Sequence, residues 1–271
     1  MEILAVIDAE TMVYQAVLKN SEDRPKTDRQ GRREWYTAMV EEDARQEITM
    51  RIEDVERELR ASRVLLAFGG ENNWRKQVLP SYKAERARKK PCGYWALVDW
   101  MCEEWESLSL PSLEADDTVG LLATGAFPEI VQGRDVIMVS EDKDMKSIPG
   151  RLYTPRKPQD GVRESCLTTA NYWHMMQTLT GDTADGYKGC PGVGPKGAEK
   201  LLKAAPRDGV WGEIVRQYEK KDLTEDDALI QAQVARILRR GDYDPKTGNL
   251  RLWTPARLKP FREGVNPWRE N

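Results

Sequence analysis

The segment "DVIMVSEDKDM", residues 135–145, places a short apolar run directly before two aspartates that lie one residue apart, Asp142 and Asp144. The length and apolar content of residues 135–140 are typical of a buried strand, and the two acids follow its end. Like charges at such a position repel each other unless water or a cation screens them. Taken alone, the pair fits a solvated loop, so its meaning depends on the rest of the chain.

Other apolar runs have the same form. Residues 2–8 ("EILAVID") end in Asp8, residues 63–70 ("RVLLAFGG") end in glycines, and residues 151–155 are a shorter candidate strand. Helical periodicity separates these runs. The predicted helices are 37–62, 93–108 and 112–127, the last with Ser112 at its start, and the polar residues 20–34 are predicted to be a loop. This alternation predicts an α/β domain with a mainly parallel sheet.

The acids of this domain come from separate segments. Parallel sheets bind ligands beyond the carboxyl ends of their strands, where Asp8, Asp142 and Asp144 are expected. In addition, Glu114, Asp116 and Asp117 open a predicted helix, where free backbone N–H groups stabilise carboxylates. We therefore expect several segments to deliver carboxylates to one edge of the sheet.

Composition narrows the possible chemistry. The chain has 271 residues, of which 32% are charged and 39% hydrophobic, as in globular proteins. It has no apolar run of membrane-spanning length and no signal-like start. Its four cysteines form no C-x-x-C pair. Together these features predict a reducing, cytosolic location. The single histidine, His174, is predicted to pack in a helix among aromatic residues. Ser-His-Asp or Cys-His catalysis would depend on this one residue, and His-rich metal sites are excluded, so any metal should be a hard cation held by oxygen.

Charge is strongly segregated along the chain. Residues 74–90 contain seven basic residues and one acid, although the formal net charge of the whole chain is −3. A cationic segment next to an acidic pocket suits a polyanionic substrate, gripped on one side and met by metal ions on the other.

The chain is predicted to be helical from about residue 165. Gly192, Gly194 and Pro195 form a glycine turn that leads into a helix, and such a turn allows close approach of an anion such as a DNA phosphate. Lys188, Lys196 and Lys200 add positive charge there. The C-terminal "NPWREN" is expected to be a surface tail anchored in part by Trp268.

Taken in order, five motifs resemble the 5′-nuclease family of flap endonucleases and bacterial or bacteriophage 5′-to-3′ exonucleases, with the phage enzymes closest. They are "VIDAE", "SYKAERARK" (81–89), "LEADDTVGLLA" (113–123), "VSEDKDM" (139–145) and "TGDTADGYKGCPGVGPKGAEKLL" (180–202). The resemblance implies a PIN-like α/β nuclease core over residues 1–165 with a helical arch at about 72–108. It also implies a helical region over residues 166–271 with a helix–three-turn–helix element at about 180–205.

The resemblance further implies a nuclease that uses two Mg²⁺ or Mn²⁺ ions. By this resemblance, the first ion is held or supported by Asp8, Glu114, Asp116 and Asp117. Whether Asp117 contacts the ion directly or supports it indirectly is left open. The second ion is served by Asp142, Asp144, Asp182 and Asp185. Two such ions can stabilise both the attacking hydroxide and the leaving oxygen of a phosphodiester. On this interpretation Asp142 and Asp144 are tolerated together because cations neutralise them.

Basic and aromatic positions also match the family. The resemblance implies that Lys83 and Arg86 grip the scissile phosphate, that Tyr82 stacks on a terminal base, and that the glycine turn binds the duplex backbone and can hold K⁺. The expected DNA-binding set is Arg75, Lys76, Arg88, Lys89, Lys188, Gly192, Gly194, Lys196 and Lys200.

One departure stands out: relatives carry an aspartate where this chain has Gly69 or Gly70, and Gly70 is the better match when counted back from "NWRK".

The leading hypothesis is a structure-specific 5′ nuclease that acts as a monomer on DNA with a 5′ end, nick or flap. RNA–DNA hybrids are expected as further substrates, and the expected location is a bacterial or phage-infected cytosol. The alternative is a catalytically impaired relative that binds branched DNA. A nuclease directed at RNA is disfavoured because the helix–three-turn–helix pattern suits duplex DNA.

Overall fold

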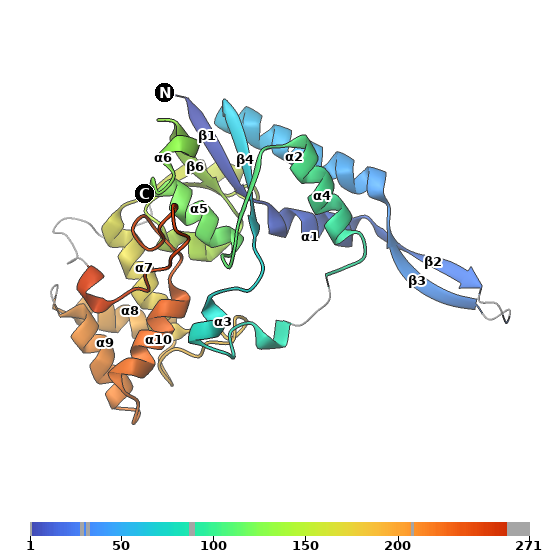
Figure 1. Ribbon diagram of the computed structural model, residues 1–271. Coiled ribbons are helices and arrows are strands. Elements are labelled where there is room, and N and C mark those ends of the chain that lie inside the picture. The colour runs from blue at the N-terminus through green and yellow to red at the C-terminus, as the bar shows by residue number, and fades with distance from the viewer. Residues whose placement is uncertain (1, 28–29, 31–32, 87–89, 207–208, 259–271) are drawn as a thin grey trace.

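The computed structural model describes residues 2–27, 30, 33–86, 90–206 and 209–258. A six-stranded sheet forms the centre of the molecule (Figure 1), in the order β5-β4-β1-β6-β7-β8. Its strands are β1 (Ile3–Asp8), β4 (Arg63–Gly69), β5 (Ser107–Leu110), β6 (Asp135–Val139), β7 (Gly150–Tyr153) and β8 (Val162–Ser165). All neighbours are parallel except β7 and β8, which confirms the predicted α/β fold with a mainly parallel sheet.

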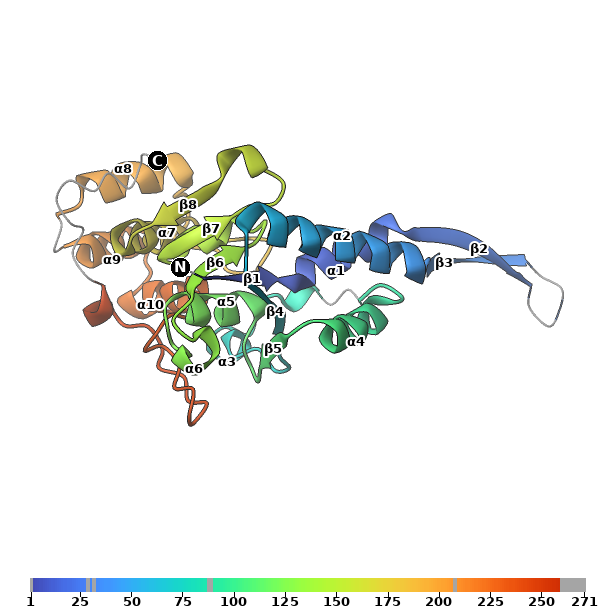
Figure 2. The same cartoon turned by 90° about the horizontal axis from the view of Figure 1, so that it is seen from above.

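The central strands are apolar throughout because both faces of the sheet are covered. Along β1, Ala5 and Ile7 point to one core, and Leu4 and Val6 point to the other. Helices α1 (Ala9–Lys19), α2 (Glu41–Leu59) and α4 (Tyr94–Glu104) pack on the first face, and α5 (Ala115–Ala123) and α6 (Pro128–Val131) on the second. The view from above (Figure 2) shows this layering.

The prediction of a loop over residues 20–34 is wrong. Strands β2 (Ser21–Thr27) and β3 (Arg33–Met39) form an antiparallel hairpin that projects away from the body of the molecule (Figures 1 and 2). Backbone pairing holds this hairpin, and β2 is almost entirely exposed. Hydrophobic periodicity could not reveal it because neither face of β2 is buried.

Helix boundaries also differ from prediction. Met39 ends β3, so α2 begins at Glu41. The predicted helix 93–108 stops at Glu104, because the alternating "SLSL" forms edge strand β5. Helix α5 has Glu114 as its N-cap instead of Ser112, which lies two residues upstream in a turn with φ of 63°.

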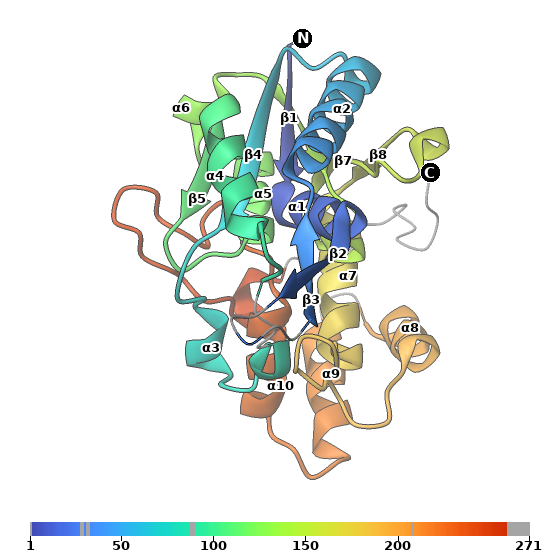
Figure 3. The same ribbon diagram turned by 90° about the vertical axis from the view of Figure 1, so that its right-hand side faces the viewer.

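The basic segment contains little helix in its described part. Helix α3 (Arg75–Val78) and a 3₁₀ turn (Ala84–Arg86) are its regular elements, so the expected helical arch is not seen among residues 72–86 and 90–93. Arg88 and Lys89 lie outside the described residues. Figure 3 shows α3 beside α10 (Glu225–Ala235), with which it is in contact.

The remaining helices are α7 (Leu167–Thr180), α8 (Pro195–Ala204) and α9 (Val210–Glu219), which with α10 build a second core. In that core the ring of His174 is fully buried, packs edge-on against Trp253, and has its Nε2 atom 2.7 Å from the Ala232 carbonyl oxygen. The prediction for His174 is confirmed. After α10 the chain returns to the sheet, where Ile237 and Leu238 join the second-face core.

The predicted domain boundary falls between β8 and α7, but this returning segment makes the two parts share one core. Trp268 and the tail lie outside the described residues. Within the described part of the chain, none of the helices combines the length and apolar character needed to cross a membrane.

The packing of α2 gives the first prediction. Ile48 is fully buried between α2 and the sheet, whereas Met50 on the same helix is half exposed. We expect Ile48→Ala to lower the free energy of unfolding by about 2–5 kcal/mol through lost burial and a residual cavity. Met50→Ala should change it by less than about 0.5 kcal/mol. Urea unfolding measures both, and equal effects would contradict this packing.

Candidate active site

Carboxylates gather where β1 and β6 end. Asp8 closes β1, is 9% exposed, and accepts a hydrogen bond from the Ser140 hydroxyl at 3.2 Å. The same hydroxyl accepts from the backbone N–H of Asp142 at 3.1 Å, and the Asp142 carboxylate accepts from the N–H of Asp144 at 2.8 Å. These bonds fix the strand exit that carries the two neighbouring aspartates.

The carboxylates act on one another electrostatically. Burial, followed by the negative charge of Glu10 and, to a lesser extent, that of Asp142, raises the pKa of Asp8 to about 7. Burial and the charges of Asp8 and Asp142 likewise raise the pKa of Asp116 well above its ordinary value. Three elements, β1, the exit of β6 and helix α5, therefore bring their acids to one place, as the sequence predicts.

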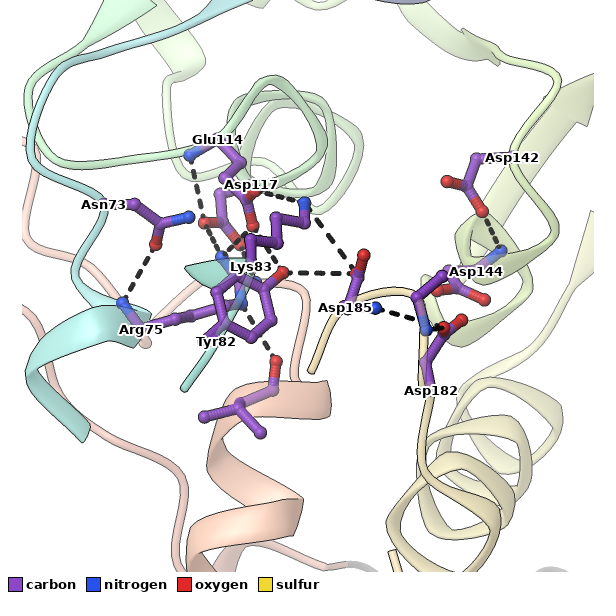
Figure 4. A network of polar contacts seen from close by, with 12 residues as sticks. Asn73, Arg75, Tyr82, Lys83, Glu114, Asp117, Asp142, Asp144, Asp182 and Asp185 are labelled. Carbon is purple, nitrogen blue, oxygen red and sulfur yellow. Dashed lines mark hydrogen bonds and ion pairs between the residues drawn. The ribbon is translucent and has the colours of Figure 1, made fainter. Parts of the chain in front are cut away.

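Asp142 also lies near a second group of acids, which are Asp144, Asp182 and Asp185 (Figure 4). Burial and the nearby charge of Asp142 raise the pKa of Asp144 to about 7, and Asp182 and Asp185 add to the effect. The Asp182 carboxylate accepts hydrogen bonds from the N–H groups of Ala184 and Asp185, at 2.9 and 3.3 Å. The loop that follows α7 thus presents its acids toward the exit of β6.

Lys83 lies between Glu114 and Asp185 (Figure 4). Its ammonium pairs closely with Glu114 and lies 3.8 Å from Asp185. Burial lowers the pKa of Lys83, but the charges of Glu114 and Asp185 outweigh this and raise it. For Glu114, burial raises the pKa, but Arg75 and Lys83 lower it to about 2. Lys83 and Glu114 therefore form a charged pair at neutral pH.

Tyr82 has a different place from the one expected. Its side chain is 3% exposed, its hydroxyl donates to Glu114 at 2.9 Å, and its ring stacks on Tyr187 with centroids 6.3 Å apart. A base can stack only on an exposed ring face, and a ring that is 3% exposed offers none, so the expected stacking of Tyr82 on a base does not fit this conformation. The residue orients Glu114 instead.

Arg75 also differs from its expected role as a DNA-binding residue. It is 2% exposed, and its guanidinium makes two hydrogen bonds of 2.7 Å to the oxygens of Asp117 and one of 2.9 Å to Glu114. It also donates to the carbonyl oxygens of Val234 and Arg236. An arginine engaged in this way cannot grip DNA. The basic run around it gave no signal of this role, because its partner Asp117 is 42 positions away.

Asp117 is fully buried and so does not face the other acids. Besides the two bonds from Arg75, its carboxylate accepts from the indole N–H of Trp74 at 3.0 Å and from the backbone N–H of Leu238 at 3.0 Å. Of the two possibilities left open for Asp117, this geometry favours indirect support: Asp117 holds Arg75, and Arg75 holds Glu114.

The other expected DNA contacts lie on the surface where they are described. Lys76, Lys188, Lys196 and Lys200 are exposed. Gly192 has a φ of 79°, Gly194 is the N-cap of α8, and Pro195 is its first residue, as the glycine turn predicts. Arg86 ends the 3₁₀ turn that follows Lys83.

The two glycines after β4 are not equivalent. A Cβ atom at Gly70 would overlap the backbone carbonyl oxygen of Leu110, whereas one at Gly69 would meet the flexible carboxylate of Glu10 at 2.8 Å. Gly70 was the better match for the missing aspartate by counting, but this backbone leaves no space for a side chain there. At Gly69 the obstacle within 3 Å is the end of a flexible side chain, which can move aside.

The donor set fits hard divalent cations, since it consists of carboxylates that repel one another and lacks thiolate and imidazole. Among the described residues, no group of three or more acids, histidines or cysteines is arranged to hold a metal ion as it stands. Glu114 is instead paired with Lys83, and the buried Asp8 and the half-buried Asp116 lie beside like charge. Cations would relieve that repulsion.

Comparison with known proteins finds relatives that cover most of the chain. A family model described as the 5′-3′ exonuclease N-terminal resolvase-like domain matches residues 3–151. The exodeoxyribonuclease of Enterobacteria phage T3 is 30% identical over 296 residues, covering 93% of this chain and 93% of that protein.

Solved structures share the fold. The phage T5 D15 protein co-crystallised with metal ions superimposes with a TM-score of 0.60 at 12% identity, covering 86% of this chain and 89% of that one. A phage T5 flap endonuclease in a pseudo-enzyme–product complex with DNA and metal ions gives a TM-score of 0.55 at 14% identity, covering 86% and 93%.

The glycine geometry predicts a difference between two neighbouring substitutions. Gly70→Ala should lower the free energy of unfolding by about 1–3 kcal/mol, because the new methyl group pushes on backbone. Gly69→Ala should cost less than about 1 kcal/mol, because a flexible side chain can move aside. Urea unfolding of both variants tests this, and a larger loss at Gly69 would show that the β4 exit is built differently.

The buried ion pair predicts a large effect of Arg75 on stability. Arg75→Met leaves Asp117 charged, buried and without its main partner, and should lower the free energy of unfolding by about 3–5 kcal/mol. The neighbouring Lys76→Met, at an exposed position, should change it by less than about 0.5 kcal/mol. The same urea titration compares them, and similar stability of the two variants would refute the central role of Arg75.

Proposed function

The chain belongs to the 5′-3′ exonuclease family, and from this premise we propose that it is a structure-specific 5′ nuclease of replication or recombination. It is a metal-dependent enzyme that hydrolyses DNA, with 5′ ends, nicks and flaps of duplex DNA as its substrates. The observation that carries this proposal is the convergence of Asp8, Asp116 and Asp142 from three elements, next to the ammonium of Lys83.

We assign the first cation to Asp8, Glu114 and Asp116, with Asp117 as support through Arg75. We assign the second cation to Asp142, Asp144, Asp182 and Asp185. When bound, Mg²⁺ or Mn²⁺ supplies Lewis-acid stabilisation of phosphate oxygens and a water of lowered pKa. Hydrolysis by water needs no covalent intermediate, so the chain needs no nucleophilic side chain at this edge.

Lys83 is the residue best placed to meet the substrate. Its raised pKa keeps it charged at neutral pH, and it lies between Glu114, which is assigned to the first cation, and Asp185, which is assigned to the second. A phosphate that enters there gains a positive partner and is shielded from the carboxylates. Arg86, three residues further on, is proposed to add a second positive charge on the same side of the substrate.

The exposed lysines and the glycine turn before α8 suit the duplex backbone. Free N–H groups at a helix N-terminus bind phosphate without reading sequence, which fits an enzyme that recognises DNA ends and branches. The proposal extends to K⁺ at this turn, to RNA–DNA hybrids as substrates, and to a monomer as the acting form. The alternative of a catalytically impaired DNA-binding protein is not favoured, since the matched relatives carry nuclease names.

Cleavage of 5′-labelled duplex, nicked, flap and RNA–DNA substrates with Mg²⁺ or Mn²⁺ tests the proposal. We expect EDTA to abolish cleavage and Asp144→Ala to reduce it by at least about 100-fold, since a carboxylate at a catalytic cation is worth several kcal/mol. Glu41→Gln, on the exposed start of α2, serves as the matched control and should cleave normally. Absence of cleavage at every divalent concentration would defeat the proposal.

A further inference from the structure

Glu10 lies beside the acids already described but was given no role by the motifs. It is the second residue of α1, two positions after Asp8. Its carboxylate accepts a hydrogen bond from the backbone N–H of Gly69 at 3.1 Å and lies 3.5 Å from the ammonium of Lys90. The side chain is 39% exposed, so its charge is not buried in the core.

The oxygen of Glu10 fills the space that a side chain at position 69 would need. An added Cβ atom at Gly69 would lie 2.8 Å from Glu10 Oε1 and 3.6 Å from the backbone nitrogen of Ala115. Ala115 is the first residue of α5, the helix that carries Glu114 and Asp116. The Glu10 carboxylate therefore lies between the end of β4 and the acidic start of α5.

This position is also close to Asp8. Asp8 is the N-cap residue of α1 and Glu10 lies in its first turn, so both acids lie at the exit of β1. A third acid near Asp8 and Asp116 increases their repulsion in the absence of cations and increases the attraction for a cation when one is present.

We propose that Glu10 supplies a carboxylate to the cation site of Asp8 and Asp116, in the place that a side chain on Gly69 would otherwise occupy. The inference deepens the proposed function and rests on it. The missing acid after β4 is then replaced by one from α1, which reaches the same location from another strand exit.

A structural role for Glu10 is the competing explanation. Glu10 could serve to hold Lys90, or to cap the N–H of Gly69. Lys90 has other contacts, however: its ammonium lies 3.1 Å from the Tyr94 hydroxyl and 4.1 Å from the centroid of the Tyr94 ring. Substituting Lys90 alone therefore tests whether the Glu10–Lys90 ion pair matters, because Glu10 itself stays in place.

The experiment is calorimetric titration of the full-length protein with Mn²⁺ in the absence of DNA. We expect Glu10→Gln to weaken the tighter Mn²⁺ binding by about tenfold or more, since cation affinity follows the charge of the ligand set. Lys90→Met should bind Mn²⁺ at least as tightly as the wild type. Glu71→Gln removes an exposed carboxylate from the loop after β4 and should have no effect.

The outcomes separate the two proposals. A wild-type protein that takes up no Mn²⁺ would defeat the proposed function itself. Normal Mn²⁺ binding by Glu10→Gln, or the same loss in Lys90→Met, would overturn the inference about Glu10 alone. Melting curves in EDTA, expected to be unchanged for Glu10→Gln, show that a loss of binding is not a loss of folding.

A relocated carboxylate gives the second test. The double variant Glu10→Ala with Gly69→Asp should bind Mn²⁺ more tightly than Glu10→Ala alone, because the new aspartate lies where the Glu10 oxygen was. Equal binding by the two would overturn the assignment of this location to the cation site. As a control, Gly69→Asp is combined with Glu71→Ala, so that Glu10 is still present. This control should not bind Mn²⁺ more tightly than Glu71→Ala alone to a comparable degree.

Discussion

The guanidinium of Arg75 is the interaction on which the site depends. It is buried with Asp117, bonds to Glu114, and reaches two carbonyl oxygens at the end of α10. Three parts of the chain, α3, the start of α5 and the segment after α10, therefore meet at one positive charge. A buried charge of this kind is tolerated only when its partners satisfy it in full, so the position of Glu114 follows from the folding of all three parts.

The acids at this edge of the sheet differ in the charges that surround them. Glu114 is stabilised as a carboxylate by Arg75 and Lys83, whereas Asp8, Asp116 and Asp144 lie among like charges and resist ionisation. The protein thus divides its acids into those neutralised by its own cations and those left for ions from solution. The acids at this edge therefore repel one another until cations from solution neutralise them.

Sequence patterns predicted the parts of the fold that are governed by burial. Strands β1, β4 and β6 are buried on both faces and read as continuous apolar runs, and the acids that follow them were placed at the correct edge. The hairpin of β2 and β3 was missed because exposed strands leave no apolar pattern. The roles of Arg75 and Tyr82 were missed because charge and aromatic content do not reveal which side chains face inward. Glu10 had a visible signal, as a second acid at the exit of β1, but its contact with Gly69 required the structure.

The hairpin has a consequence for association between molecules. A ribbon of two strands has an open backbone edge on each side, and such edges invite pairing with further strands. Here β2 carries Pro25, which lacks an N–H group, flanked by the exposed charges of Arg24 and Lys26. A neighbouring copy that tried to pair with β2 would meet a residue without an N–H group and exposed charges of both signs. The composition of this strand therefore protects the protein against aggregation at the element least covered by its own core.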